Sequence, residues 1–461
     1  RGRMRANISR DVYSQPLVDA LFDGFPTALR WAQVVSAFEH ALPAPVRGGA
    51  ASTLFLVGVE PTSLRVASRM TSAESASVAG RAAWRRMHRL AYYLWPLRRL
   101  RPLLLVAQLD DISDLPRLRV PKFASNGGGG ARCGHKLPVP ILLKGLGSTD
   151  LLHRLHARAA ATELREARAP WGQRSRVAAW RGSARSVVPS ETCETAPLAR
   201  WEDHPRGRLV AISSRHPDEV DAGYSELEKL PGGNTTAVPI RRGMSWGEMG
   251  RRKFLIEVDG HGYQASLAAK MMLRSVVLTQ ASRWRLWYEP WLRDMEHVVV
   301  VRPDLSDLRE KLAWLWRHDA TAQKIGERGA LWIGRLLQED SILQYMRRVL
   351  LRYHRLFTSE PPPAQEALFR SLCSARRTCK FFTAEAPPKL FAKKADSAAA
   401  LEALSSDAVI DSCPTSHRGD GSTRQCQSWC RALDKRDHCT WCRCATCSFC
   451  STHAQYRPAG A

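Results

Sequence analysis

The stretch that most constrains the fold runs from Lys253 to Asp304. It opens with a short apolar run of β-forming residues at 253–258, which a glycine-rich turn interrupts. Residues 263–274 then carry apolar side chains at helical spacing, and two further β-type runs follow at 275–280 and 298–301. Strand, glycine turn, helix and strand in this order predict a βαβ unit in a parallel sheet covered on both faces. The free amides at the helix start would point at the turn, which is typical of an anion site.

With 461 residues, of which 44% are hydrophobic, the chain is long enough for two domains of ordinary size and a tail. Its formal net charge of +25 suggests an anionic partner such as nucleic acid, a membrane surface or a sugar nucleotide. The excess is mostly arginine spread through every segment, whereas a nucleic-acid binder is expected to concentrate it on one face, so we expect no nucleic-acid partner. No apolar run reaches the roughly 18 residues of a transmembrane helix, and we expect no membrane span in this chain.

Eight of the twelve cysteines lie between Cys413 and Cys450, and this density predicts a small Cys-rich module at 413–450. Spacings such as Cys439-x-x-Cys442 suit zinc, while an even number of cysteines suits four disulfides. We favour disulfides because the sequons at Asn7 and Asn234 fit a secretory route, and the zinc alternative stays open.

Three carboxylates follow a buried-type strand predicted at 103–109: Asp110, Asp111 and Asp114. In open α/β sheets, function gathers at the carboxyl ends of strands, so a catalytic carboxylate is one interpretation. An ordinary polar strand exit or a helix cap is the second interpretation, and a metal-binding acidic motif is a third.

A second candidate site follows a short strand predicted at 177–180. Arg181, Gly182, Ser183 and Ser186 combine a guanidinium group, a residue that lets backbone approach closely, and two hydroxyl groups, which suit a diphosphate. In so arginine-rich a chain, a solvated loop is the plain alternative.

Seven segments in this order resemble glycosyltransferase family 90, the group of Rumi-type protein O-glucosyltransferases and capsule-associated xylosyltransferases. The resemblance is firm from about residue 177 to 355, thin from 50 to 176 and absent beyond about 360. The segments are Trp180-Arg-Gly-Ser183 with Ser186, HPDEVDAGY at 216–224, KFLIEVDGHGY at 253–263, SVVL at 275–278, Glu296-His297, Asp304-Leu-Ser-Asp307 and AQKIGERG at 322–329.

The resemblance implies an α/β fold of the GT-B type, in which two Rossmann-like domains face each other across a cleft. It places an acceptor-side domain at 1–170 and a UDP-sugar-binding domain with a return helix at 171–358. A linker at 359–412 and the Cys-rich module complete the predicted organisation.

The activity that the resemblance implies is inverting transfer of glucose or xylose from UDP-glucose or UDP-xylose, with neither a cofactor nor a metal required. The acceptor would be a serine hydroxyl of a protein, including EGF-like domains, or a glycan hydroxyl, in the lumen of the endoplasmic reticulum or Golgi. Asp111 matches the family's catalytic base. The expected donor-binding residues are Arg181, Gly182, Ser183, Ser186, Asp259, Gly260, Gly262, Tyr263, Gln264 and Ser266.

Two positions depart from the family pattern. Ser266 stands where the family has an arginine on the first turn of the helix, and Lys270, one turn further on, is a candidate replacement cation. Leu286 stands where Rumi-type enzymes have an acidic residue, with Glu289 three positions away. These departures motivate one alternative, a catalytically degraded member that binds glycan or protein as a scaffold. The net charge of +25 motivates another, a basic protein that binds an anion such as RNA.

Overall fold

The computed structural model describes sixteen ranges of the chain, all within one compact unit that spans Tyr13–Phe391. The ranges are 15–23, 25–40, 54–109, 121–124, 127–128, 136–138, 140, 168–184, 187–189, 195–197, 200–226, 240–260, 266–282, 284–361, 365–374 and 378–388. The predicted Cys-rich module lies outside them. No helix within these ranges is long and apolar enough to cross a bilayer.

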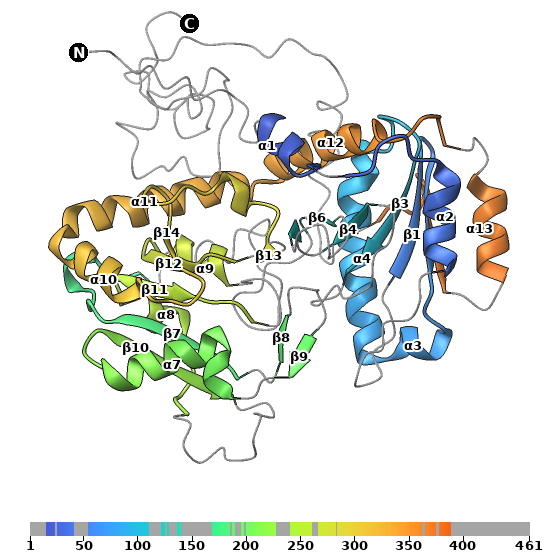
Figure 1. The fold of residues 1–461 in the computed structure, drawn as a ribbon. Helices are drawn as coiled ribbons and strands as arrows, with labels where there is room; N and C mark the ends of the chain where they lie inside the picture. Colours follow the sequence, from blue (N-terminus) through green and yellow to red (C-terminus); the bar gives the residue numbers. More distant parts are fainter. Residues whose placement is uncertain are drawn as a thin grey trace, which may run out of the picture. The chain divides into compact units, whose positions relative to one another are not determined.

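The first sheet is mixed and has six strands (Figure 1). In spatial order they are β15 (Cys379–Phe382), β2 (Ser63–Ser68), β1 (Leu54–Glu60), β3 (Leu103–Gln108), β4 (Lys122–Ala124) and β6 (Lys136–Pro138). β1 is antiparallel to β2 and β3, whereas β3, β4 and β6 are parallel. The sheet thus differs from an all-parallel Rossmann sheet, because Glu60 pairs with Ser63 across a two-residue turn that returns β2 along β1.

Helices cover both faces of the first sheet (Figure 1). They are α2 (Trp31–His40), α4 (Val78–Leu97) and α13 (Gln365–Ser374), with the short α1 (Gln15–Ala20) and α3 (Ser72–Ala76) nearby. Phe55 of β1 packs edge-on against Trp84 of α4, with the ring centroids 5.0 Å apart. On the other face, a Cβ added at Gly58 would lie 2.6 Å from Phe369 of α13, so the missing side chain lets the helix approach the strand.

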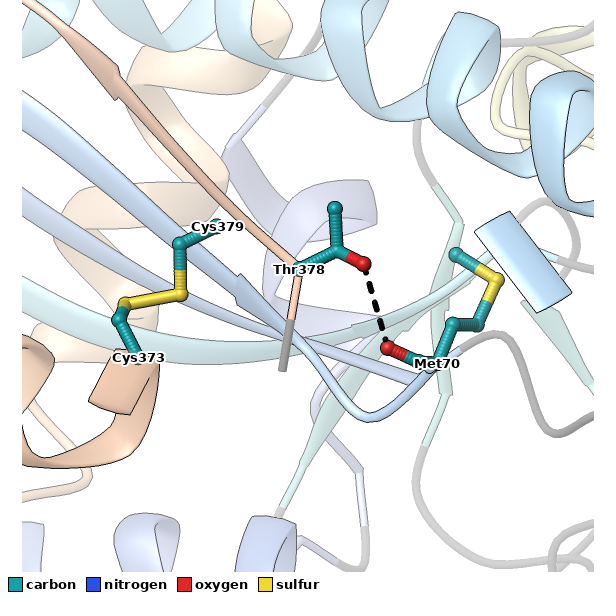
Figure 2. The surroundings of a disulfide bond; sticks show 4 residues. All are labelled: Met70, Cys373, Thr378 and Cys379. Atoms are coloured by element: carbon teal, nitrogen blue, oxygen red, sulfur yellow. Dashed lines mark hydrogen bonds between the residues drawn. A yellow bond between two sulfur atoms is a disulfide. The ribbon is translucent and has the colours of Figure 1, made fainter. Parts of the chain in front are cut away.

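The last described helix and strand, α13 and β15, are part of the first sheet and its helical cover. β15 pairs antiparallel with β2, and the disulfide Cys373–Cys379 joins α13 to β15 (Figure 2). Next to it, Thr378 donates from Oγ1 to the carbonyl of Met70, at 3.3 Å. The linker predicted from residue 359 is therefore wrong for the residues of α13 and β15, whose apolar positions Phe369 and Phe382 are buried in the sheet's core.

The second sheet is parallel throughout, as the βαβ reading of residues 253–301 predicted. In spatial order its strands are β10 (Val220–Glu226), β7 (Ala178–Ser183), β11 (Phe254–Glu257), β12 (Val276–Gln280) and β14 (Val299–Val301). Every second strand residue, such as Trp180 and Ile256, joins one hydrophobic core with flanking helices. The intervening residues, such as Arg181 and Glu257, face the opposite side. Two sheets and their helices confirm the predicted α/β class.

The helices of this half are α7 (Pro205–Arg215), α8 (Trp246–Gly250), α9 (Leu267–Met272), α10 (Leu308–Arg317) and α11 (Asp319–Leu336). α7, α10 and the start of α11 contribute to the core, as shown by Leu209, Leu312 and Ile325. The structure describes α9 from Leu267, within the helix predicted at residues 263–274, and residues 263–265 of that prediction lie outside the described ranges. One-turn helices occur at η2 (Trp171–Gln173), η3 (Trp201–Asp203) and η4 (Glu289–Trp291).

The helix α12 (Glu339–His354) follows α11 and contacts the first sheet. Its Tyr353 hydroxyl donates to the carbonyl of Leu104 in β3 at 3.0 Å, and its Tyr345 hydroxyl donates to the carbonyl of Pro138 in β6 at 2.6 Å. Two small antiparallel pairs are also present: β13 (Trp284–Arg285) with β5 (Gly127–Gly128), and β8 (Val187–Pro189) with β9 (Thr195–Pro197).

Candidate functional site

The carboxyl edge of the second sheet gathers the candidate residues that the structure describes. Because β7, β11 and β12 are parallel, the residues that follow them lie along one edge: Ser183 at the end of β7, residues 258–260 after β11, and residues 281–282 after β12. This is the edge at which open α/β sheets bind ligands.

Arg206, in the first turn of α7, connects two of these strand ends. Its Nε donates to the carbonyl of Asp259 at 3.1 Å, and its Nη1 donates to the carbonyl of Ser183 at 2.7 Å. The guanidinium group also lies 5.6 Å from the ring centroid of Trp180. A Cβ added at Gly260 would lie 2.6 Å from Nη2, so this glycine makes room for the guanidinium group.

His204 caps α7 and ties it to the same turn. This side chain is 1% exposed. Its Nδ1 accepts the backbone amide of Arg206 at 3.1 Å, and its Nε2 lies 3.3 Å from the carbonyl of Gly260. A nitrogen that faces a carbonyl must donate, so the imidazole is neutral with its proton on Nε2. The beginning of α7 is thereby fixed against the turn after β11.

Asp259 is held from both its backbone and its side chain. Its amide donates to Oε1 of Gln280 at 3.0 Å, and Gln280 in turn donates to the carbonyl of Pro303 at 2.6 Å. Ser282 donates from Oγ to the Asp259 carboxylate at 2.7 Å. The turn after β11 is thus connected to the ends of β12 and β14.

A buried ion pair lies directly before this turn. Glu257, the last residue of β11, pairs with Lys270 of α9, and the two are 4% and 2% exposed. Lys270 also donates to the carbonyl of Ile256 at 2.7 Å, and Ser266 donates from Oγ to both carboxylate oxygens, each at 2.8 Å. The expectation that Lys270 replaces the family's arginine is wrong, because its ammonium group is enclosed against the sheet.

Arg181 is directed away from the strand ends. It lies on the face opposite Trp180 and forms an ion pair with Asp221 of β10, from Nη2 to Oδ1 at 2.8 Å. Its Nη1 donates to the carbonyls of Trp180 and Asp221, each at 2.8 Å, and its Nε donates to that of Arg242 at 3.1 Å. In this conformation the guanidinium group supports the edge of the sheet.

A further carboxyl group, which the sequence reasoning did not assign to the site, is that of Glu289 in η4. Burial raises the pKa of Glu289 to about 8, and the nearby carboxylates of Asp259 and Glu257 contribute to the rise. Within the described part of the chain its Oε1 is buried and accepts no hydrogen bond. Glu289 is therefore a mostly neutral carboxylic acid at pH 7.

Three of the predicted site residues contact the Arg206 side chain: Ser183, Asp259 and Gly260. A fourth, Ser266, donates to the carboxylate of Glu257, the last residue of β11. The backbone of Gly182 lies against the indole ring of Trp180. A Cβ added at this glycine would lie 2.6 Å from the ring, which is too close. Five predicted site residues lie outside the described ranges and stay predictions: Asp111, Ser186, Gly262, Tyr263 and Gln264.

Sequence reasoning missed His204 and Arg206, although one signal was available. Proline is favoured at the first position of a helix, so Pro205 marks the start of α7 and makes His204 its cap. No group of three or more histidine, cysteine, aspartate or glutamate side chains within the described ranges is arranged to hold a metal ion.

Comparison with known proteins identifies several that are similar to this chain. The chain is 27% identical over 230 residues to O-glucosyltransferase rumi of Drosophila pseudoobscura pseudoobscura, covering 49% of this chain and 50% of the relative. It is 26% identical over 220 residues to Protein O-glucosyltransferase 1 of Homo sapiens, covering 48% and 50%. It is also 27% identical over 214 residues to Uncharacterized protein 035R of Invertebrate iridescent virus 3, covering 43% and 18%.

The chain thus spans about half the length of the two glucosyltransferases that it matches. The model of the family described as Glycosyl transferase family 90 matches residues 146–386, which is more than half of the chain. This range extends past both ends of the firm part of the resemblance, 177 to 355, and takes in α13 and β15. The chain belongs to glycosyl transferase family 90.

Proposed function

We propose that this chain is a glycosyltransferase that moves glucose or xylose from a UDP-sugar to a hydroxyl group of a protein acceptor. Family membership and the names of the two O-glucosyltransferase relatives support the reaction class and favour glucose. A GT-B arrangement would place the acceptor beside the first sheet and the donor at the carboxyl edge of the second. Serine residues of EGF-like domains are the acceptor class that the resemblance favours.

The observation that carries the proposal is the position of Arg206. A guanidinium group held by two backbone carbonyls at the strand ends is preorganised to meet the negative charge that develops on a departing UDP. The amino-terminal end of α7, which is the positive end of its helix dipole, lies at the same edge. Ser183 and Gly260 would line the diphosphate, and the glycine lets the ligand approach the backbone.

The reaction would invert the anomeric centre. Asp111 would take the proton of the acceptor hydroxyl while the oxygen attacks the anomeric carbon, and the bond to the UDP oxygen would break on the opposite face. The electron pair of that bond leaves with UDP, whose charge Arg206 would stabilise. No metal is required in this proposal, because the guanidinium group of Arg206 and the dipole of α7 would supply the positive potential.

Release of UDP from UDP-glucose and UDP-xylose, with and without an EGF-like acceptor, tests the proposal. We expect Asp111→Asn to lower turnover by about 100-fold or more and to leave UDP binding unchanged. Arg206→Ala should lower turnover and weaken UDP binding. Arg215 is an exposed arginine at the far end of α7, so Arg215→Ala should change neither turnover nor UDP binding. A wild-type chain that neither binds UDP nor releases it from either donor would refute the proposal.

A second candidate is a family member that binds the donor without turning it over. It is favoured by Ser266 and Lys270, which hold Glu257 in place of offering a cation to the strand ends. Loss of one such cation can cost about 100-fold in rate or more. Under this candidate, UDP binds but is not released from a donor, and Ser266→Arg restores turnover.

We also propose a compartment of the secretory pathway, either the endoplasmic reticulum or the Golgi lumen. The disulfide Cys373–Cys379 supports this location, because disulfides persist in oxidising compartments.

A further inference from the structure

A cavity lies on the face of the second sheet that is opposite the core formed with α7 and α10. Its volume is about 510 Å³, within the range of small-molecule sites. It is lined by residues that precede β7 and β11, such as Ser175 and Arg252, and by Arg181. Arg181 was predicted as a donor-binding residue, but its guanidinium group is directed to this face. Ser183, Asp259, Gly260 and Arg206, on which the proposed UDP-sugar site rests, lie instead at the carboxyl ends of these strands, so the cavity is separate from that site.

Positive charge dominates this cavity. Four arginines line it, namely Arg181, Arg242, Arg251 and Arg252, and Glu248 is the acidic residue among its lining side chains. Glu248 forms an ion pair with Arg242. Arg251 is exposed, and no ion pair with it is found within the described ranges.

Asp221, which is not itself a lining residue, forms ion pairs with three guanidinium groups. Its Oδ1 accepts from Arg181 at 2.8 Å and from Arg241 at 2.6 Å, and its Oδ2 accepts from Arg252 at 3.0 Å. Arg252 also donates to Oγ of Ser175 at 3.3 Å. One carboxylate cannot neutralise three guanidinium groups, so a positive potential is left at the wall of the cavity.

These arginines are oriented before any ligand arrives. The Arg181 and Arg252 side chains are 10% and 24% exposed and are fixed by Asp221, while the Arg242 side chain is 79% exposed and can turn towards a ligand. Fixed guanidinium groups bind the oxygens of a tetrahedral anion with paired, charge-assisted hydrogen bonds. The cavity exceeds the size of a single ion, which leaves space for the molecule that carries the anion.

We propose that this arginine cavity binds a phosphate or sulfate ester of a small molecule such as a sugar. The site is independent of the proposed transferase function. Its net charge favours a phosphate ester, which is mostly a dianion at pH 7, over a sulfate ester, which is a monoanion, and over a neutral sugar, because each extra negative charge is attracted by the same excess of guanidinium groups. An ester at this face would bind without competing for the strand ends.

Calorimetric titration of the full chain with glucose 6-phosphate, glucose 6-sulfate, inorganic phosphate and glucose tests the assignment. The titration is run without UDP and is repeated with UDP at a saturating concentration, because UDP is itself a phosphate ester and can occupy the cavity as well as the strand ends. We expect one ester to bind at one site, and glucose not to bind. The ester that binds more tightly shows whether the site takes a phosphate or a sulfate group.

The informative variant is Arg242→Ala with Arg251→Ala, because both side chains are exposed and their loss should leave the fold intact. We expect it to weaken ester binding by about tenfold or more. The control is Arg293→Ala with Arg317→Ala, which removes the same charge from exposed positions elsewhere and should weaken binding by less than about twofold. Equal weakening in both variants, binding of inorganic phosphate alone, binding of glucose, or no ester binding would each overturn the proposal.

Discussion

Replacing Glu289 with glutamine should change the pH dependence of stability in a defined direction. Burial raises the pKa of Glu289 to about 8 from the usual 4.5, with the Asp259 and Glu257 carboxylates adding to the effect. Between these two values the folded chain keeps a proton that the unfolded chain has lost. The free energy of unfolding therefore falls as the pH rises from about 4.5 to about 8. Glutamine has nearly the same shape as the neutral acid and no proton to lose.

The size of the effect follows from the two pKa values. Their difference corresponds to at most about 5 kcal/mol. Because Glu289 is partly exposed, solvent screens part of this amount, and we expect about 2–3 kcal/mol. Relative to wild type, Glu289→Gln should thus be stabilised by about 2–3 kcal/mol at pH 9 and by close to nothing at pH 4.5.

Urea denaturation of both proteins at pH 5, 7 and 9 measures this difference directly. Glu310→Gln, an exposed change in α10, is the control and should give the same difference at every pH. If the difference between Glu289→Gln and wild type does not grow with pH, the carboxyl group is already ionised in the folded protein. The burial argument would then be wrong.

Three further variants test the geometry around the site. Gly260→Ala places a Cβ 2.6 Å from the guanidinium group of α7 and should weaken UDP binding by about tenfold; calorimetry showing wild-type affinity would contradict this. Lys270→Met leaves the Glu257 carboxylate buried without its cation, so urea denaturation should show a free energy of unfolding lower by about 3–5 kcal/mol. Adding Glu257→Gln to this variant should recover part of that loss. Replacing both Cys373 and Cys379 by serine opens a short loop and should cost about 2 kcal/mol, and an unchanged urea midpoint would count against it.

The second sheet was predictable because its strands are short, continuous apolar runs. Val299–Val301 and Val276–Gln280 are buried on both faces, so their sequences carry no polar alternation and read as parallel strands. β15 was not predictable in the same way. It is four residues long, and its partner β2 lies about 310 residues earlier, so no local pattern indicates the pairing.

For the candidate site, the strand ends were predictable and the helix that completes them was not. Ser183, Asp259 and Gly260 follow apolar runs, and parallel pairing brings them to one edge. Arg206 is one arginine among many, and its role depends on α7 beginning at Pro205. The direction of Arg181 depends on strand alternation and on Asp221 in a neighbouring strand, which a single segment does not encode.

The pairing of β15 with β2 also has a consequence for biosynthesis. The ribosome releases β1 and β2 early, yet the outer edge of their sheet stays open until residues 379–382 have emerged. An open edge can pair with another nascent chain, so β2 is exposed to such pairing for most of translation. Chains that terminate prematurely before β15 would carry the entire predicted donor site and still be prone to aggregate.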